Sequence, residues 1–142
     1  MPFSWRSREA LGRCADALGR YAQSMSAPRE AFEIDIDPAR VAEWLAEDPS
    51  LQVIDVRELY EREAGHIDGT RHIELVKLTS EAASVERERP VVFYCRVGGR
   101  SQMAAQAFRA SGYEAYSMDG GLRRWAEEGR PLTPEGGTVA NH

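Results

Sequence analysis

A glycine-rich turn follows an apolar run in the stretch Val91-Val92-Phe93-Tyr94-Cys95-Arg96-Val97-Gly98-Gly99-Arg100-Ser101. The first four residues are β-branched or aromatic, which is typical of a buried parallel strand. After the turn the apolar spacing becomes helical, and the expected inward face comprises Met103, Ala104, Ala107, Phe108 and Ser111. The sequence therefore predicts that Cys95 lies where a central strand ends and a short loop leads into a helix.

This position favours nucleophilic chemistry at Cys95. A tight glycine-rich loop can turn several backbone N–H groups inward, and the start of a helix adds its positive end. Such a cradle stabilises an anion and so favours the thiolate, which is the nucleophilic form of cysteine. Arg96 and Arg100 add two cations, and Ser101 is the expected N-cap of the helix. We therefore expect attack on an electrophilic atom of a small anionic substrate, rather than a purely structural cysteine.

The length of the loop separates two kinds of anion chemistry. Four residues stand between Cys95 and Arg100, whereas phosphatases of the tyrosine type have five, and Tyr94 rather than histidine precedes the cysteine. A shorter loop makes a smaller ring of N–H donors, which suits one extra sulfur atom better than a phosphoryl group. Phosphatase or arsenate reductase chemistry on the same cradle is the less favoured alternative.

Motifs elsewhere in the chain accompany this loop. In chain order they are Val53–Glu58, Glu63–Thr70, the loop Cys95–Ser101, Gly112–Tyr113, and Met118–Leu122 with Trp125. With these motifs, residues 32–132 resemble the rhodanese family of sulfurtransferases, specifically its single-domain thiosulfate sulfurtransferases. Thr70 stands where the family often has alanine.

The resemblance implies a two-step sulfur transfer. The Cys95 thiolate would take the outer sulfur of thiosulfate or a similar donor, and cyanide or a thiol would remove it from the resulting persulfide. A thioredoxin-like protein is one candidate thiol acceptor. Cys95 is the expected catalytic residue, and the expected substrate-binding residues are Arg96, Val97, Gly98, Gly99, Arg100 and Ser101. No metal and no organic cofactor is expected. A rhodanese-like binding or regulatory module is the alternative from a different functional class.

Within this loop, each residue has an expected task. The inward N–H groups of residues 96–101 would stabilise the anionic outer sulfur, and Arg96 and Arg100 would bind the sulfonate of the donor. Gly98 and Gly99 would supply backbone angles that a side chain hinders. Ser101 would cap the helix or donate a hydrogen bond to the persulfide.

Composition agrees with a small cytoplasmic enzyme. The chain has 142 residues, a net charge of −5 and two cysteines, Cys14 and Cys95, so we expect no disulfide framework. No apolar run approaches a transmembrane span and no signal peptide is recognisable, so a membrane partner is not favoured. No basic stripe indicates a nucleic-acid partner.

Strand and helix patterns alternate along the domain, which predicts a three-layer α/β fold with a mostly parallel five-stranded sheet and helices on both faces. The expected strands are residues 32–36, 52–56, 71–74, 91–94 and 113–117. Residues 1–30 form an N-terminal extension with an amphipathic helix, which would dock on the domain or pair with a copy of itself, with contact to a membrane surface as the less favoured alternative. Residues 31–133 form the rhodanese-like domain, and residues 134–142 are expected to be a disordered tail.

Two polar residues outside the loop admit both structural and functional interpretations. Asp55 ends a strand at the edge where α/β proteins bind ligands, where it could orient the loop or hold Arg57 near the pocket, but a turn or capping role is favoured. His66 has the chemistry of a general base, but closing a turn by hydrogen bonding is favoured, since an existing thiolate needs no base.

Overall fold

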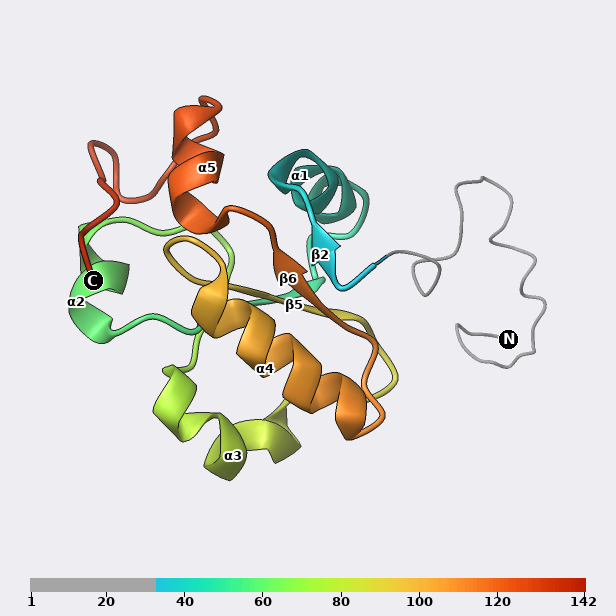
Figure 1. Ribbon diagram of the computed structural model, residues 1–142. Coiled ribbons are helices and arrows are strands. Elements are labelled where there is room, and N and C mark those ends of the chain that lie inside the picture. Colours follow the sequence, from blue (N-terminus) through green and yellow to red (C-terminus); the bar gives the residue numbers. More distant parts are fainter. Residues whose placement is uncertain (1–32) are drawn as a thin grey trace.

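The computed structural model describes residues 33–142 (Figure 1). The expected amphipathic helix of residues 1–30, its self-pairing and Cys14 lie outside the described residues. Within residues 33–142, no helix combines the length with the apolar character that a membrane crossing requires.

One sheet forms the centre of the described chain, with the strand order β2-β6-β5-β3-β4 (Figure 1). The strands are β2 (Asp35–Ile36), β3 (Gln52–Asp55), β4 (Arg71–His72), β5 (Val91–Tyr94) and β6 (Ala115–Met118). Every pairing is parallel. This confirms the predicted five-stranded sheet, although most strands are shorter than the sequence indicates.

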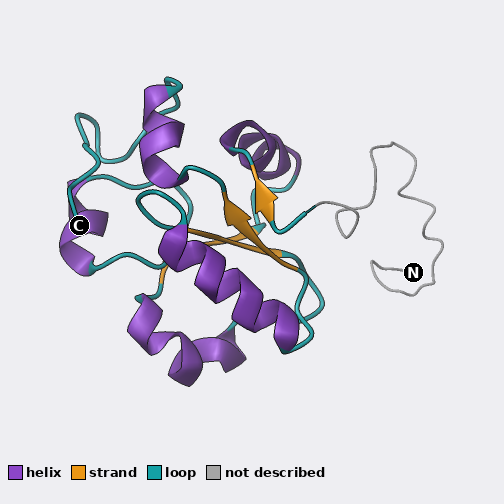
Figure 2. Ribbon diagram, viewed as in Figure 1, coloured by secondary structure: helices purple, strands orange, loops and turns teal. Residues whose placement is uncertain are grey.

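Helices cover both faces of this sheet, which makes three layers (Figure 2). The helical elements are α1 (Pro38–Glu47), α2 (Leu59–Ala64), η2 (Leu75–Lys77), α3 (Leu78–Glu81), η3 (Ala82–Ser84), α4 (Gly99–Ala110) and α5 (Gly121–Glu127). Apolar side chains of α3 and α4 pack on one face, and those of α1 and α5 pack on the other. The α/β fold class predicted from the alternating pattern is therefore confirmed.

The central strand β5 shows why the sequence folds this way. All four of its side chains are buried, because helices cover the sheet on both sides. Phe93 joins the apolar cluster on the α4 side, whereas Val92 and Tyr94 join the cluster on the α1 side. Cys95 therefore follows a strand that is anchored in both halves of the core.

Helix boundaries were predicted with mixed success. Asp37 caps α1 through its side chain, which accepts a hydrogen bond from the backbone N–H of Arg40, as expected. The predicted helix at residues 76–83 is instead a short α-helix between two 3₁₀ turns. The predicted inward face of α4 was also wrong in part, because Met103, Ala107 and Ser111 are exposed. The buried face is Ser101, Ala104, Ala105 and Phe108.

The C-terminal segment 134–142 follows a defined course along α2, which differs from the disorder expected for it. The backbone N–H of Thr138 donates to the carbonyl of Ala64 over 2.8 Å. The side chain of Val139 packs against the apolar cluster on the α1 side of the sheet. The hydroxyl of Tyr60 donates to the carbonyl of Asn141 over 3.0 Å. This course brings the chain end close to the loop that follows Cys95.

Candidate active site

Cys95 lies at the carboxyl end of β5 with 1% of its surface exposed. Its sulfur accepts a hydrogen bond from the backbone N–H of Gly98 at 3.1 Å and a longer one from the N–H of Ser101 at 3.4 Å. Both donors belong to the loop and first turn that lead into α4. The thiol is therefore positioned where backbone dipoles stabilise negative charge on sulfur.

Ser101 is not the N-cap that the sequence predicts. Gly98 occupies the N-cap and Ser101 falls inside the first turn of α4, where its side chain is fully buried. Its hydroxyl lies 3.5 Å from the sulfur of Cys95, 3.2 Å from the carbonyl oxygen of Gly98 and 2.7 Å from the hydroxyl of Ser117. The hydroxyl of Ser101 therefore lies between the sulfur of Cys95 and the carbonyl of the N-cap residue Gly98.

Ser117 is a site residue that sequence reasoning missed. It lies in β6, the neighbour of β5, and its side chain is fully buried. Its only signal in the sequence is a polar residue inside an otherwise buried strand, and that signal does not identify a partner.

The two glycines of the loop have different roles. Gly98 has a φ of +119°, a conformation that other residues rarely adopt, which agrees with the expectation for it. Gly99 does not fit the same expectation. A Cβ atom added there would meet nothing within 4 Å, and its φ lies outside the left-handed region.

A second glycine turn, Gly120–Gly121, packs against the loop that follows Cys95. The backbone N–H groups of Leu122 and Arg123, at the start of α5, donate to the carbonyls of Cys95 and Arg96 over 2.8 and 3.0 Å. Gly121 makes this approach possible, because a Cβ atom there would lie 2.4 Å from the carbonyl oxygen of Arg96. Sequence reasoning placed Gly121 in a family motif but gave it no role at the site.

Arg100 is held in an ion pair at the edge of the site. Its two terminal nitrogens donate to the two carboxylate oxygens of Glu61 over 2.9 and 3.0 Å, and Glu61 is fully buried. The expected positive charge of Arg100 is thus balanced by an acid from α2. The hydrogen bonds and charge of Glu61, set against burial, raise the pKa of Arg100.

Glu61 is stabilised as a carboxylate. Burial alone would raise the pKa of this carboxyl. Hydrogen bonds from Arg100 and from the backbone of Glu58, together with the charges of Arg100 and Arg57, outweigh burial and lower the pKa. The sequence offered no clear signal for this role, because Glu61 and Arg100 are 39 residues apart.

Arg96 and Val97 lie on the outer part of the loop. One terminal nitrogen of Arg96 donates to the side-chain oxygen of Asn141 over 3.2 Å. The Nε atom of Arg96 is buried and has no hydrogen-bond partner within the described residues. Val97 is about half exposed. The loop thus places Val97 toward solvent, whereas Arg96 lies half-buried against the C-terminal segment.

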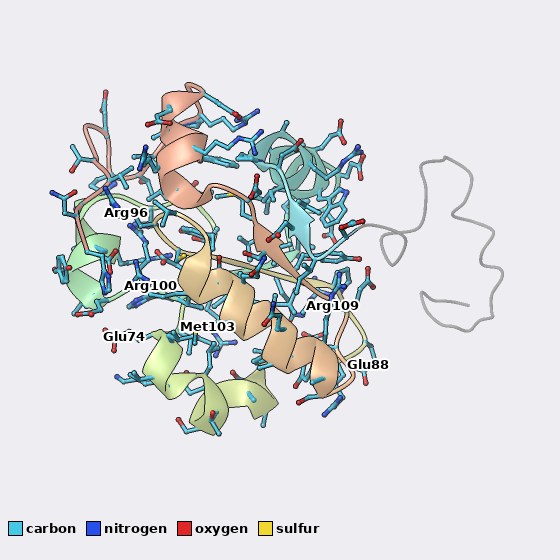
Figure 3. All side chains as sticks on the ribbon, viewed as in Figure 1. Glu74, Glu88, Arg96, Arg100, Met103 and Arg109 are labelled. Carbon is cyan, nitrogen blue, oxygen red and sulfur yellow. The ribbon has the colours of Figure 1, made fainter. Side chains whose placement is uncertain are left out.

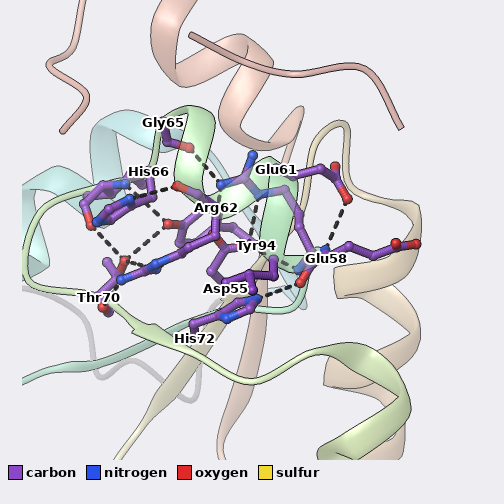
Figure 4. Close-up of polar contacts among 12 residues, drawn as sticks. Asp55, Glu58, Glu61, Arg62, Gly65, His66, Thr70, His72 and Tyr94 are labelled. Atoms are coloured by element: carbon purple, nitrogen blue, oxygen red, sulfur yellow. Dashed lines mark hydrogen bonds and ion pairs between the residues drawn. The ribbon is translucent and has the colours of Figure 1, made fainter. Parts of the chain in front are cut away.

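A buried polar network holds the strand end beside the loop (Figure 4). Asp55 pairs with Arg57 through two side-chain hydrogen bonds of 2.8 and 2.7 Å, and both side chains are fully buried. Arg57 also donates to the carbonyl of Gly65. Both interpretations of Asp55 describe part of what is seen: its carboxylate accepts from the backbone N–H of Arg57, as in a turn, and it also holds the Arg57 side chain.

Tyr94 and His66 complete this network. Burial and the charge of Asp55, partly offset by hydrogen bonds with Thr70 and with the backbone N–H of Ile67, raise the pKa of the Tyr94 hydroxyl to about 12. His66 lies against the carbonyl of Arg62, with Nδ1 at 3.0 Å, so it closes a turn as favoured. Within the described residues, no group of three metal-ligating side chains is assembled.

Comparisons with known proteins agree with this architecture. A model of the rhodanese-like domain matches residues 37–128. The chain is 43% identical over 75 residues to the YqhL protein of Bacillus subtilis. These aligned residues make up 52% of this chain and 60% of that protein. It is 37% identical over 75 residues to the thiosulfate sulfurtransferase GlpE of Pseudomonas aeruginosa, covering 52% of this chain and 68% of GlpE.

Solved structures show the same fold. A rhodanese-related protein from Thermoplasma volcanium superimposes with a TM-score of 0.66 at 28% identity. The match covers 71% of this chain and 98% of that one. The residues that the family model matches include the strand, loop and helix around Cys95.

Proposed function

Since this chain belongs to the rhodanese-like domain family, we propose that it is a sulfurtransferase that carries a sulfane sulfur on Cys95. The observation that carries the proposal is the position of the Cys95 sulfur, which accepts backbone hydrogen bonds from the loop at 3.1 and 3.4 Å. A relative that is a thiosulfate sulfurtransferase supports the same chemistry.

The first step loads the cysteine. The Cys95 thiolate attacks the outer sulfur of thiosulfate, a Cys95 S–S bond forms, and the S–S bond of thiosulfate breaks. Sulfite leaves with the electron pair, and the anionic persulfide remains on the protein. Inward N–H groups of residues 96–101 stabilise the charge on the outer sulfur, as donors do in an oxyanion hole.

The second step removes the outer sulfur from Cys95. A thiolate or cyanide attacks the outer sulfur, and the Cys95 thiolate leaves. Arg96 and Arg100 bind the sulfonate of the donor in the first step. Glu61 occupies two of the five N–H groups of the Arg100 guanidinium, so donors remain for this anion. No metal or organic cofactor takes part.

Intact-mass measurement after incubation with thiosulfate tests the proposal. Wild-type protein should gain about one sulfur atom, and cyanide should remove it while thiocyanate forms. Cys95→Ser should show no gain, which also excludes loading of Cys14. Absence of the gain in wild type, or its persistence in Cys95→Ser, contradicts the proposal. Hydrolysis of an aryl phosphate or reduction of arsenate instead would favour the alternative chemistry.

A further inference from the structure

The C-terminal segment reaches the loop that follows Cys95 through Asn141. The Nη2 atom of Arg96 donates to the side-chain oxygen of Asn141 over 3.2 Å. The hydroxyl of Tyr60 donates to the backbone carbonyl of Asn141 over 3.0 Å, which fixes the position of this residue beside α2. Asn141 lies outside residues 37–128, the part of the chain that the family model matches. A residue outside the matched domain thus contacts an arginine of the candidate site.

The two arginines of the loop are held with different strength. Figure 3 labels Arg96 and Arg100 near each other, well away from Arg109 at the opposite end of α4. Arg100 donates to both carboxylate oxygens of the fully buried Glu61. Arg96 donates to one neutral oxygen of Asn141, an exposed residue. Hydrogen bonds to a carboxylate are much stronger than those to a neutral acceptor. The contact of Arg96 is therefore the one that a bound anion can replace.

One edge of the Arg96 guanidinium is only partly used. Arg57 shows the full use of this edge, because its Nε and Nη2 atoms donate to the two carboxylate oxygens of Asp55 over 2.8 and 2.7 Å. Arg96 donates through Nη2 to Asn141, whereas its buried Nε has no hydrogen-bond partner within residues 33–142. A buried N–H group without a partner is costly. A sulfonate can accept from both N–H groups with two of its oxygens, but the single amide oxygen of Asn141 satisfies only one.

We propose that Asn141 sets the affinity of the site for a sulfonate donor, because its side-chain oxygen competes with the sulfonate for the Arg96 guanidinium. This inference rests on the proposed function, in which Arg96 binds the donor. When thiosulfate binds, two sulfonate oxygens accept from Nε and Nη2 of Arg96, and the exposed side chain of Asn141 turns away. Asn141 is a positioning residue, since it acts through Arg96 and contacts no reacting atom.

Steady-state kinetics with thiosulfate and cyanide test this competition. Asn141→Ala removes the competing oxygen and should lower the KM for thiosulfate about threefold, with kcat unchanged. Asn141→Asp supplies two charged oxygens to the same edge and should raise this KM about tenfold. Thr138→Asp adds the same charge at another exposed position of the segment and should leave the KM as in wild type. An unchanged or higher KM in Asn141→Ala overturns the proposal.

A donor without a sulfonate gives the matched comparison. With the persulfide of 2-mercaptoethanol, the Cys95 thiolate attacks the outer sulfur, the S–S bond breaks, and the 2-mercaptoethanol thiolate leaves. The outer sulfur moves to Cys95 with its proton. The KM for this donor should be the same in wild type and in Asn141→Ala. An equal change in KM for both donors would mean that Asn141 only supports the loop, and it overturns the proposal.

A binding measurement separates this inference from the proposed function. Cys95→Ser cannot take up sulfur, so thiosulfate binds to it without reaction. In the isotope-labelled full chain, the NMR signal of the Arg96 Nε–H group, identified by its loss in Arg96→Lys, reports this binding. Addition of Asn141→Ala should lower the Kd about threefold, even where wild type shows no turnover and the proposed function fails. An equal Kd, or a signal that thiosulfate does not shift, rejects the role of Asn141 alone.

Discussion

At the residue scale, the side chains of Ser101 and Ser117 control the surroundings of the Cys95 sulfur. Ser101 brings a hydroxyl to 3.5 Å from it, and Ser117 brings a second hydroxyl to 2.7 Å from the first. A hydroxyl has one proton to donate and can accept two. When Ser117 donates to Ser101, the proton of Ser101 is free for the sulfur or for the carbonyl of Gly98.

Ser117→Ala should therefore weaken sulfur transfer more than it weakens the fold. Loss of one buried hydrogen bond costs about 1 kcal/mol, so we expect kcat/KM for thiosulfate to fall about five-fold with a modest drop in Tm. Ser111→Ala removes the same hydroxyl from an exposed position and is the matched control. Equal kinetics for the two variants would show that Ser117 has no role in transfer.

The Glu61–Arg100 pair belongs to the same scale and makes stability depend on pH. The folded-state pKa of Glu61 is lowered from its ordinary value of 4.5. As the pH falls through this region the unfolded chain takes up the proton first, so the stability contributed by the carboxylate is present above 4.5 and is lost below it.

Glu61→Gln should accordingly unfold at lower urea concentration than wild type at pH 7. The difference in stability between the two proteins should narrow as the pH falls below 4.5 towards 3, because the unfolded wild type then binds a proton that folded Glu61 resists. Removal of one partner of a buried pair costs about 3 kcal/mol at neutral pH. Urea titration at both pH values checks this, with Glu127→Gln as an exposed control. An equal difference in stability between wild type and Glu61→Gln at both pH values would contradict a stabilising Glu61 carboxylate.

At the element scale, the junction between β5 and α5 holds the loop in place. The start of α5 donates two backbone hydrogen bonds to the carbonyls of Cys95 and Arg96. Gly121 has a φ of +62° and leaves no space for a Cβ atom against those carbonyls. The loop geometry therefore depends on an element that follows it by about twenty residues.

Gly121→Ala should displace the loop and abolish most activity. Gly129→Ala is the matched control, because Gly129 also has a positive φ but a Cβ atom there would meet nothing. Backbone strain at a positive φ should lower the free energy of unfolding of each variant by about 1 kcal/mol. The clash of the added Cβ atom with the carbonyls of Cys95 and Arg96 should lower that of Gly121→Ala by about 2 kcal/mol more. Thiosulfate turnover and thermal melting measure the two effects. Similar activity in both variants would mean that the junction does not set the loop.

At the scale of the whole molecule, the C-terminal segment 134–142 fastens α2 to the body of the domain. The approach is close at Gly65, where a Cβ atom would lie 2.4 Å from the carbonyl oxygen of Thr138. Gly65 itself has an extended backbone with a φ of 172°, so alanine there is free of conformational strain. Any cost of that substitution must come from the segment packed on it.

A double-mutant cycle tests this contact. Gly65→Ala should cost about 2 kcal/mol in the full chain and close to zero in a chain ending at Thr133, because the atom that it meets is then gone. Urea unfolding of the four proteins gives the coupling energy. Equal costs in the full and shortened chains would show that the segment does not pack on α2.

The sequence by itself determined the alternation of strands and helices, the strand that ends at Cys95 and the loop that follows it. These features are local, because periodicity, glycine and a capping aspartate act within a few residues. Only the tertiary structure decided the pairing of Arg100 with Glu61, the hydroxyl that Ser117 brings to Ser101, and the support from Gly121. Each of these three contacts joins residues that are far apart in the chain. The elements that carry these residues meet at one edge of the parallel sheet only when the whole domain is folded.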